Sequence, residues 1–128
     1  MRVFKLTTPK RGFMDVTGQV KEALSDSGFK DGLCAVFVPH TTAAVTINES
    51  ADPDVRDDIL LGLEKAFPDR KEFRHAEGNS HAHLKASAVG SSVTIMVENG
   101  SLVLGVWQGV FFCEFDGPRE RKFMVKFV

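Results

Sequence analysis

The spacing of hydrophobic and polar residues changes several times along the chain, and each spacing predicts a different element. Short apolar or alternating runs are typical of β-strands. They occur at residues 2–8, 13–16, 33–38, 43–47, 93–97, 102–106, 110–115 and 122–128. Asn99-Gly100 is a strong signal for a tight hairpin turn, and Asp116-Gly117-Pro118 predicts a second turn between strands. The last forty residues therefore predict an antiparallel β meander.

Helical spacing appears in the first half of the chain. One segment runs to Ser27, with Asp15 or Thr17 as its N-cap and Gly28 as a left-handed stop. A second segment begins with Asp52 as N-cap and Pro53 at the first helical position. Its apolar stripe, which Pro68 follows, consists of Val55, Ile59, Leu63 and Phe67. These two helices are the clearest local predictions of the pattern.

A third, shorter helix is predicted after a charged loop over residues 69–79. Asn79 or Ser80 is its expected cap, and it runs through Val89 to a stop at Gly90. Together these elements predict one α+β domain over residues 1–128, with mainly antiparallel, sandwich-like β-sheet and two or three helices.

Composition narrows the functional classes only slightly. The 128 residues carry a formal net charge of −1, which gives no global electrostatic reason to expect nucleic acid or a membrane surface as partner. Cys34 and Cys113 lie singly in apolar runs and are expected to be buried, reduced thiols. The sequence shows neither a secretory signal nor an apolar spanning segment, and a cytoplasmic location is therefore expected.

The four histidines are the strongest clue to function. His75, His81 and His83 lie within nine residues of a polar stretch, and His40 opens the run His-Thr-Thr. Imidazole is the usual zinc ligand and also titrates near neutral pH. If residues 80–89 are helical, His81 and His83 differ by about 200° around the axis, and only one of them can face a shared site. A surface or structural role for each histidine remains the alternative.

Acidic residues provide partners for such a site. Asp52 and Asp54 are explained by helix capping and the helix dipole, whereas Asp58 lies deeper in its helix, next to Ile59. Glu49 follows a strand, and a strand exit beside His40 could place it as a general base or as a partner of a ligand histidine.

Basic residues gather near the C-terminus. Arg119, Arg121 and Lys122 follow the Asp-Gly-Pro turn. They could bind phosphate through charge and paired guanidinium hydrogen bonds, or they could be solvated charges that protect a sheet edge. The residues alone leave both interpretations open.

Three blocks of residues resemble the YjbQ family. The first is His40-Thr41-Thr42-Ala43-Ala44 followed by Ile47-Asn48-Glu49 and Asp52-Pro53-Asp54-Val55. The second is Ala82-His83-Leu84-Lys85-Ala86-Ser87 with Gly90-Ser91-Ser92. The third is Gly105-Val106-Trp107-Gln108-Gly109 with Glu114-Phe115-Asp116-Gly117-Pro118-Arg119. The match runs in uninterrupted order from about residue 30 to the C-terminus.

The resemblance implies a compact α+β fold that assembles as a homotrimer, with sites near subunit contacts. It also implies a link to a secondary thiamine-phosphate synthase activity, which joins a pyrimidine pyrophosphate to a thiazole phosphate and expels pyrophosphate. The functional residues that it implies are His40, His75, His83, Glu49, Asp58 and Arg121. His81 does not match a histidine expected throughout the family.

These expectations combine into one chemical hypothesis. His40, His75 and His83 would hold a divalent ion, with zinc favoured, and Lys85 or Arg121 would neutralise a phosphate or pyrophosphate group. Glu49 or Asp58 would orient a ligand histidine or relay a proton. The alternative is a homotrimer that binds a metal or a small phosphorylated metabolite without efficient catalysis.

Overall fold

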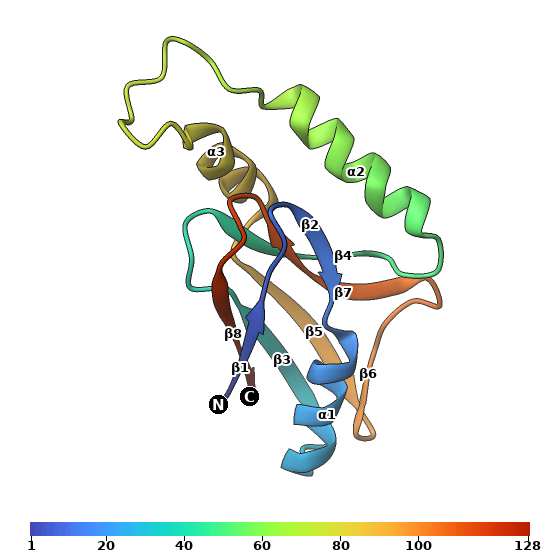
Figure 1. Cartoon of the computed structure of the whole chain (residues 1–128). Helices are drawn as coiled ribbons and strands as arrows, with labels where there is room; N and C mark the ends of the chain where they lie inside the picture. Colours follow the sequence, from blue (N-terminus) through green and yellow to red (C-terminus); the bar gives the residue numbers. More distant parts are fainter.

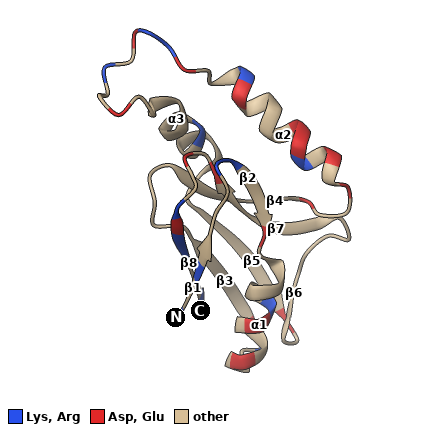
Figure 2. Cartoon of the chain, viewed as in Figure 1, with Lys and Arg blue, Asp and Glu red and all other residues tan.

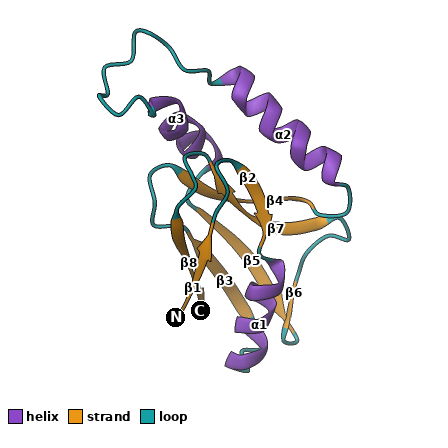
Figure 3. Ribbon diagram, in the orientation of Figure 1, coloured by secondary structure: helices purple, strands orange, loops and turns teal.

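The computed structural model describes residues 1–128 and builds them into two antiparallel sheets and three helices (Figures 1 and 3). The larger sheet has the strand order β1-β8-β3-β5-β6, and the smaller sheet has the order β2-β7-β4. The strands are β1 (Arg2–Thr7), β2 (Gly12–Asp15), β3 (Gly32–Phe37), β4 (Ala43–Glu49), β5 (Ser92–Glu98), β6 (Ser101–Leu102), β7 (Gln108–Glu114) and β8 (Glu120–Phe127). The helices are α1 (Thr17–Ser27), α2 (Pro53–Ala66) and α3 (Ser80–Val89). The predicted α+β class is confirmed.

The main hydrophobic core lies between the two sheets and is closed at one end by α1. Alternate residues of β3, β5 and β8 point into it, and so do the inner residues of β4 and β7. A second cluster covers the other face of the small sheet, where Ala82 and Ala86 of α3 pack on Phe111 and Phe115. Residues 109–114 of β7 are therefore buried on both faces.

The apolar stripe of α2 faces the second cluster, but the helix packs loosely. Ile59, Leu60 and Leu63 contact the cluster, yet no residue of α2 is fully buried. The Asp52 side chain accepts a hydrogen bond from the Asp54 amide at 2.9 Å, which confirms the predicted N-cap. Figure 2 shows charged residues of both signs along α2, as expected for a largely solvated helix.

The other helix ends follow the predictions in part. Gly28 adopts φ 68° and stops α1 in the left-handed conformation, as predicted. Asp15 Oδ1 accepts hydrogen bonds from the amide and hydroxyl of Thr17, although neither side chain is the formal N-cap. Asn79 is the N-cap residue of α3, as predicted, but its side chain makes no capping hydrogen bond and donates instead to Asp116.

The β5–β6 hairpin is also only partly as predicted. Asn99 and Gly100 have φ values of 50° and 75°, the left-handed pair of a type I′ turn. The returning strand β6 is limited to Ser101–Leu102, however, and the chain then leaves the sheet. Val106 and Trp107 follow in a loop and are 85% and 62% exposed.

The outer face of the five-stranded sheet is covered by no helix (Figure 1). On this face Leu33 of β3 is opposite Met96 of β5. Met124 of β8 lies between its partners Val3 on β1 and Phe37 on β3. Val3, Leu33, Phe37 and Met96 are between 43% and 62% exposed. This face therefore presents apolar side chains to the surroundings of the single chain. None of the three helices is long and apolar enough to cross a membrane.

Candidate functional site

Four of the predicted site residues line one hollow, which we call the polar hollow. It has a volume of about 490 Å³, and its lining contains no hydrophobic side chain. The lining residues are Pro39, His40, Thr41, Thr42, His75, Glu77, Asn79, His83, Asp116, Arg119 and Arg121. They come from the β3–β4 loop, from α3 and the segment that leads into it, and from the β7–β8 turn with the start of β8. The fold thus joins segments that lie far apart in the sequence.

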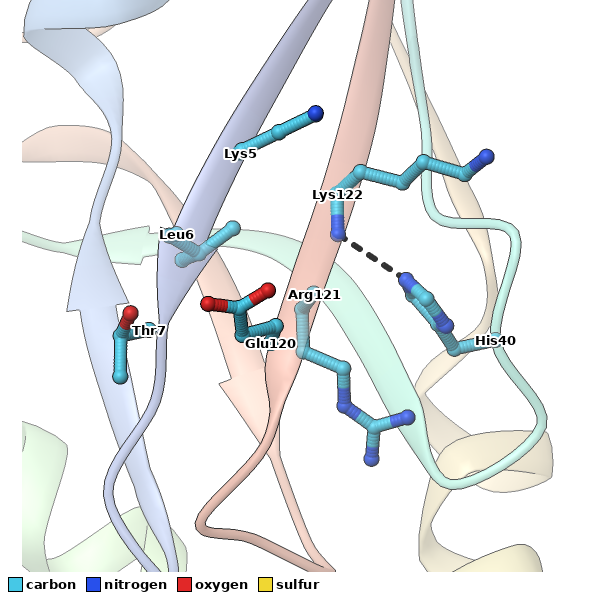
Figure 4. Close-up of a pocket in the computed structure, with 7 residues that line it drawn as sticks. All are labelled: Lys5, Leu6, Thr7, His40, Glu120, Arg121 and Lys122. Carbon is cyan, nitrogen blue, oxygen red and sulfur yellow. Dashed lines mark hydrogen bonds between the residues drawn. The ribbon is translucent and has the colours of Figure 1, made fainter.

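His40 is fixed by the sheet itself. Strand β3 pairs with β8 only as far as Phe37 and Met124, and beyond that point the chain turns away at Pro39. The His40 imidazole then takes the place of a strand carbonyl, because its Nε2 accepts a hydrogen bond of 3.0 Å from the Lys122 amide (Figure 4). Since Nε2 is an acceptor in this bond, the proton of the neutral ring is on Nδ1.

The surroundings of His40 favour that neutral form. Burial lowers the pKa of His40, and the nearby positive charge of Arg121 lowers it further. A neutral imidazole with a proton on Nδ1 can donate to an anionic or polar ligand, and its other nitrogen is already satisfied.

Arg121 is buried and held in one orientation by Glu114. Its Nε and Nη2 atoms donate to the two carboxylate oxygens of Glu114 at 2.8 and 2.6 Å, and Nη2 also donates to Thr42 Oγ1 at 2.8 Å. The side chains of Arg121 and Glu114 are 6% and 0% exposed. The guanidinium Nη1 has no hydrogen-bond partner in the protein. It therefore remains available to a ligand in the hollow.

Glu114 is ionised because of this network. Burial raises the pKa of Glu114, but hydrogen bonds from Arg121, Thr8 and the Asp116 amide lower it more, and the net pKa lies below the ordinary carboxyl value. A buried carboxylate with this many donors stays charged, and the pair with Arg121 is a fixed part of the core.

A second arginine lies at the rim of the hollow. Arg119 donates from Nε to the Asp116 backbone carbonyl and from Nη2 to the Asp116 carboxylate, at 2.8 and 3.0 Å. Asn79 donates to the same carboxylate oxygen at 2.8 Å. Burial raises the pKa of Asp116, but the hydrogen bonds from Asn79 and Arg119 outweigh it, and the net pKa is lowered. The Arg119 side chain is 49% exposed and retains free donors.

Two of the other histidines meet across the hollow. The rings of His75 and His83 lie with their centroids 5.7 Å apart and are nearly perpendicular. His81 is on the other side of α3, where it faces Asp69 and lines a separate small hollow with Lys10 and Arg11. His83 therefore lines the polar hollow and His81 does not, in agreement with the helical geometry.

The three candidate ligand histidines do not fit a zinc site in this arrangement. No three histidine, cysteine, aspartate or glutamate side chains of the chain are placed to hold one ion. The physical obstacle is His40, whose Nε2 is occupied by the Lys122 amide. Metal binding through Nδ1 would require loss of the remaining ring proton, which is costly for an imidazole.

Three other candidates lie outside the polar hollow. Glu49 is at the opposite end of β4 from His40, about 20 Å of strand away, and its carboxylate accepts from the Ala51 amide. Asp58 is on the solvent-exposed part of α2. Lys85 is completely buried, and its Nζ lies 2.9 Å from Glu64 Oε1, which joins α3 to α2. Within one chain, none of these three residues lines the hollow that contains His40.

The cysteines match the prediction of buried, reduced thiols. Both are free and buried, and neither lines the polar hollow. Burial raises the pKa of Cys34 to about 11 and raises the pKa of Cys113 as well. Neither thiol is suited to act as a nucleophile near neutral pH.

Comparison with known proteins gives a consistent result. The family model described as "UPF0047 protein YjbQ-like" matches residues 2–128. A UPF0047 protein from Methanocaldococcus jannaschii is 49% identical over 98% of this chain and 91% of its own length. The UPF0047 protein YugU from Bacillus subtilis is 47% identical over 98% of this chain and 97% of its own length.

Solved structures agree with the fold. The crystal structure of an uncharacterised YjbQ/UPF0047 protein from Clostridium acetobutylicum has a TM-score of 0.97 and 54% identity, with complete coverage of both chains. A conserved hypothetical protein from Thermus thermophilus has a TM-score of 0.93 and 44% identity, also with complete coverage of both chains. This chain therefore belongs to the UPF0047 YjbQ-like family.

Proposed function

We propose that the polar hollow binds the phosphate or pyrophosphate group of a small metabolite. The observation that carries the proposal is the set of hydrogen-bond donors that remain free there. Arg121 Nη1, the exposed edge of Arg119 and the Nδ1–H group of His40 belong to a hollow whose lining, apart from Pro39, is polar. Guanidinium groups are the side chains best suited to phosphate oxygens.

The reaction that we propose for this site is the one implied by the family resemblance. A pyrimidine pyrophosphate loses pyrophosphate as its carbon forms a bond to the nitrogen of a thiazole phosphate. Charge develops on the leaving pyrophosphate, and donors fixed before the reaction stabilise such charge most effectively. Arg121 fulfils that condition because Glu114 and Thr42 hold its guanidinium group. The alternative is a phosphometabolite-binding protein without efficient turnover, and measured release of pyrophosphate separates the two.

The homotrimer and the cytoplasmic location also remain expectations. The apolar outer face of the five-stranded sheet, with Leu33, Phe37 and Met96, is a surface that contact between copies would cover. Glu49, Asp58 and the Trp107 loop lie away from the polar hollow of their own chain. In a trimer they could take part only in the site of a neighbouring copy.

Arg119→Gln is expected to weaken the binding of inorganic phosphate by roughly 10-fold or more, because a charged hydrogen bond contributes about 1.5–3 kcal/mol. Isothermal titration calorimetry at constant salt measures the change in Kd. Arg2→Gln is the matched control. Arg2 is a similarly exposed arginine, and the acids with which it pairs, Glu22 and Asp26, are on α1. Equal affinity in the wild type, Arg119→Gln and Arg2→Gln would show that phosphate does not bind at the polar hollow.

Zinc binding by His40, His75 and His83 stays a prediction, and it requires the His40–Lys122 hydrogen bond to break. Elemental analysis of protein purified without chelators would then find about one ion per subunit. The ion should be lost in His40→Ala, His75→Ala and His83→Ala and kept in His81→Ala. Absence of metal from the wild type, or its retention in all four variants, would leave these histidines as proton donors and acceptors for the phosphate site.

A further inference from the structure

A second hollow adjoins the polar hollow. It has a volume of about 440 Å³ and shares His40, Thr41 and His83 with its neighbour. We call it the hydroxyl hollow. Its remaining lining residues are Ala43, Ala86, Ser87, Gly90 and Ser91. None of its eight lining residues is a lysine, arginine, aspartate or glutamate, in contrast to the polar hollow.

Its hydrogen-bonding groups are free. The hydroxyl groups of Thr41, Ser87 and Ser91 make no hydrogen bond to another group of the protein, and Thr41, Ser87 and Ser91 are all exposed. Each hydroxyl can both donate and accept. Three such groups on one concave surface, with two imidazole rings at its border, suit an uncharged ligand group that carries donors and acceptors.

The floor of the hydroxyl hollow is fixed by the backbone. Gly90 donates to the Ala86 carbonyl at 2.9 Å and accepts from the Val45 amide at 3.1 Å, and the Ser91 carbonyl accepts from the Val38 amide at 2.8 Å. Space exists there because the residues at this end of α3 and at the start of β4 are small. These hydrogen bonds therefore hold the backbone on this side of the hollow in place.

We propose that the two hollows form one bipartite site for a phosphate monoester. The phosphate group lies in the polar hollow, and an uncharged ring that carries hydroxyl or amine groups lies in the hydroxyl hollow. His40 and His83 stand at the boundary between them. The inference rests on the proposed phosphate site and adds the class of molecule that the phosphate belongs to.

The lack of charge decides which group the hydroxyl hollow accepts. A second phosphate or a carboxylate would find no cation there and would lose hydration without compensation. A neutral group would exchange its hydrogen bonds to water for hydrogen bonds to the three hydroxyl groups of the hollow. The volumes of the two hollows are each within the range of small-molecule sites.

Ser87→Phe tests the inference, because it fills the hydroxyl hollow from an exposed helix position and leaves the arginines of the polar hollow unchanged. Calorimetry with inorganic phosphate, ribose 5-phosphate and pyridoxine 5′-phosphate gives the three Kd values. In the wild type at least one monoester should bind about 10-fold more tightly than inorganic phosphate, as expected for a few added hydrogen bonds. In Ser87→Phe this advantage should disappear, while the Kd for inorganic phosphate stays the same.

Ala88→Phe is the matched control, since Ala88 is the next exposed residue of α3 and does not line either hollow. It should retain the monoester advantage, and thermal unfolding of both variants checks the fold. Ser87→Ala, which removes one hydroxyl without filling the space, should lose only part of the advantage.

The failures of the two proposals differ. If inorganic phosphate itself does not bind the wild type, the phosphate site fails and the bipartite site fails with it. If phosphate binds but neither monoester binds more tightly, or if Ser87→Phe keeps the advantage, only the bipartite site is overturned.

Discussion

Arg121→Leu is expected to lower the free energy of unfolding by about 3–5 kcal/mol at neutral pH, the usual cost of leaving one member of a buried ion pair without its partner. Glu114 would then be a carboxylate with 0% exposure that keeps only the hydrogen bonds from Thr8 and the Asp116 amide. Urea unfolding of the wild type and the variant measures the difference. The Arg121→Leu variant should also lose phosphate binding.

The pH dependence gives this prediction a second readout. In the wild type the net pKa of Glu114 is below its ordinary value, so its stabilising effect is present above the ordinary carboxyl pKa and is lost as pH falls through the lowered pKa. In Arg121→Leu, the hydrogen bonds and charge of Arg121 no longer oppose the effect of burial, and the pKa of Glu114 rises. Protonation then relieves the cost, and the stability deficit should shrink as the pH is lowered from about 8 to about 5.

Arg2→Leu is the control for Arg121→Leu. It removes an exposed arginine, with 40% side-chain exposure, from pairs with Glu22 and Asp26, and should lower the free energy of unfolding far less than Arg121→Leu does, because exposed ion pairs contribute little. The double variant Glu114→Leu/Arg121→Leu should recover part of the stability that Arg121→Leu loses, since it removes the unpaired charge. A deficit of Arg121→Leu as small as that of Arg2→Leu would contradict the buried-pair account.

Glu64→Leu is expected to be far more destabilising than Lys85→Met, although both break the same ion pair. Lys85 is completely buried, and Glu64→Leu leaves its ammonium group without a counter-charge, at a cost of about 2–4 kcal/mol. In Lys85→Met the remaining Glu64 is 26% exposed and still pairs with Arg11 at 2.8 Å. That variant should lose less than about 1.5 kcal/mol.

The same pair of variants tests whether Lys85 belongs to the site. Lys85→Met should leave the Kd for phosphate unchanged, because Lys85 lines neither hollow and serves to join α2 to α3. In the stability measurement, Glu22→Leu is a suitable control for Glu64→Leu, since Glu22 is an exposed acid in a helix. Loss of phosphate binding in a folded Lys85→Met protein would show that Lys85 contributes to the phosphate site.

Most of the elements could be predicted because their signals are local. The cap and proline at the start of α2, the left-handed Gly28 and the Asn99-Gly100 turn each depend on a few adjacent residues. The separation of His81 from His83 followed from helical geometry alone. The return strand after Gly100 could not be placed, since apolar residues such as Val106 resemble strand residues even when they lie in an exposed loop.

The candidate site was predictable only in part, because pairings between distant segments set its composition. Glu49 and His40 are close in sequence, but an extended strand separates them, whereas Lys85 is next to site residues on α3 and points into the interface with α2. Glu114 is not among the site residues that the sequence predicts. An acid inside the apolar run of residues 110–115 is a signal that it needs a buried partner, and Arg121 lies just across the following turn.

The imidazole of His40, placed where a strand carbonyl would otherwise stand, makes the backbone amide of Lys122 a natural reporter of the site. A ring that gains a second proton or turns toward an ion no longer accepts that hydrogen bond, and the amide proton then exchanges with solvent more readily. The resonance of a single backbone group on β8 therefore carries information about ligand, proton and metal, and it can be followed before any substrate is known.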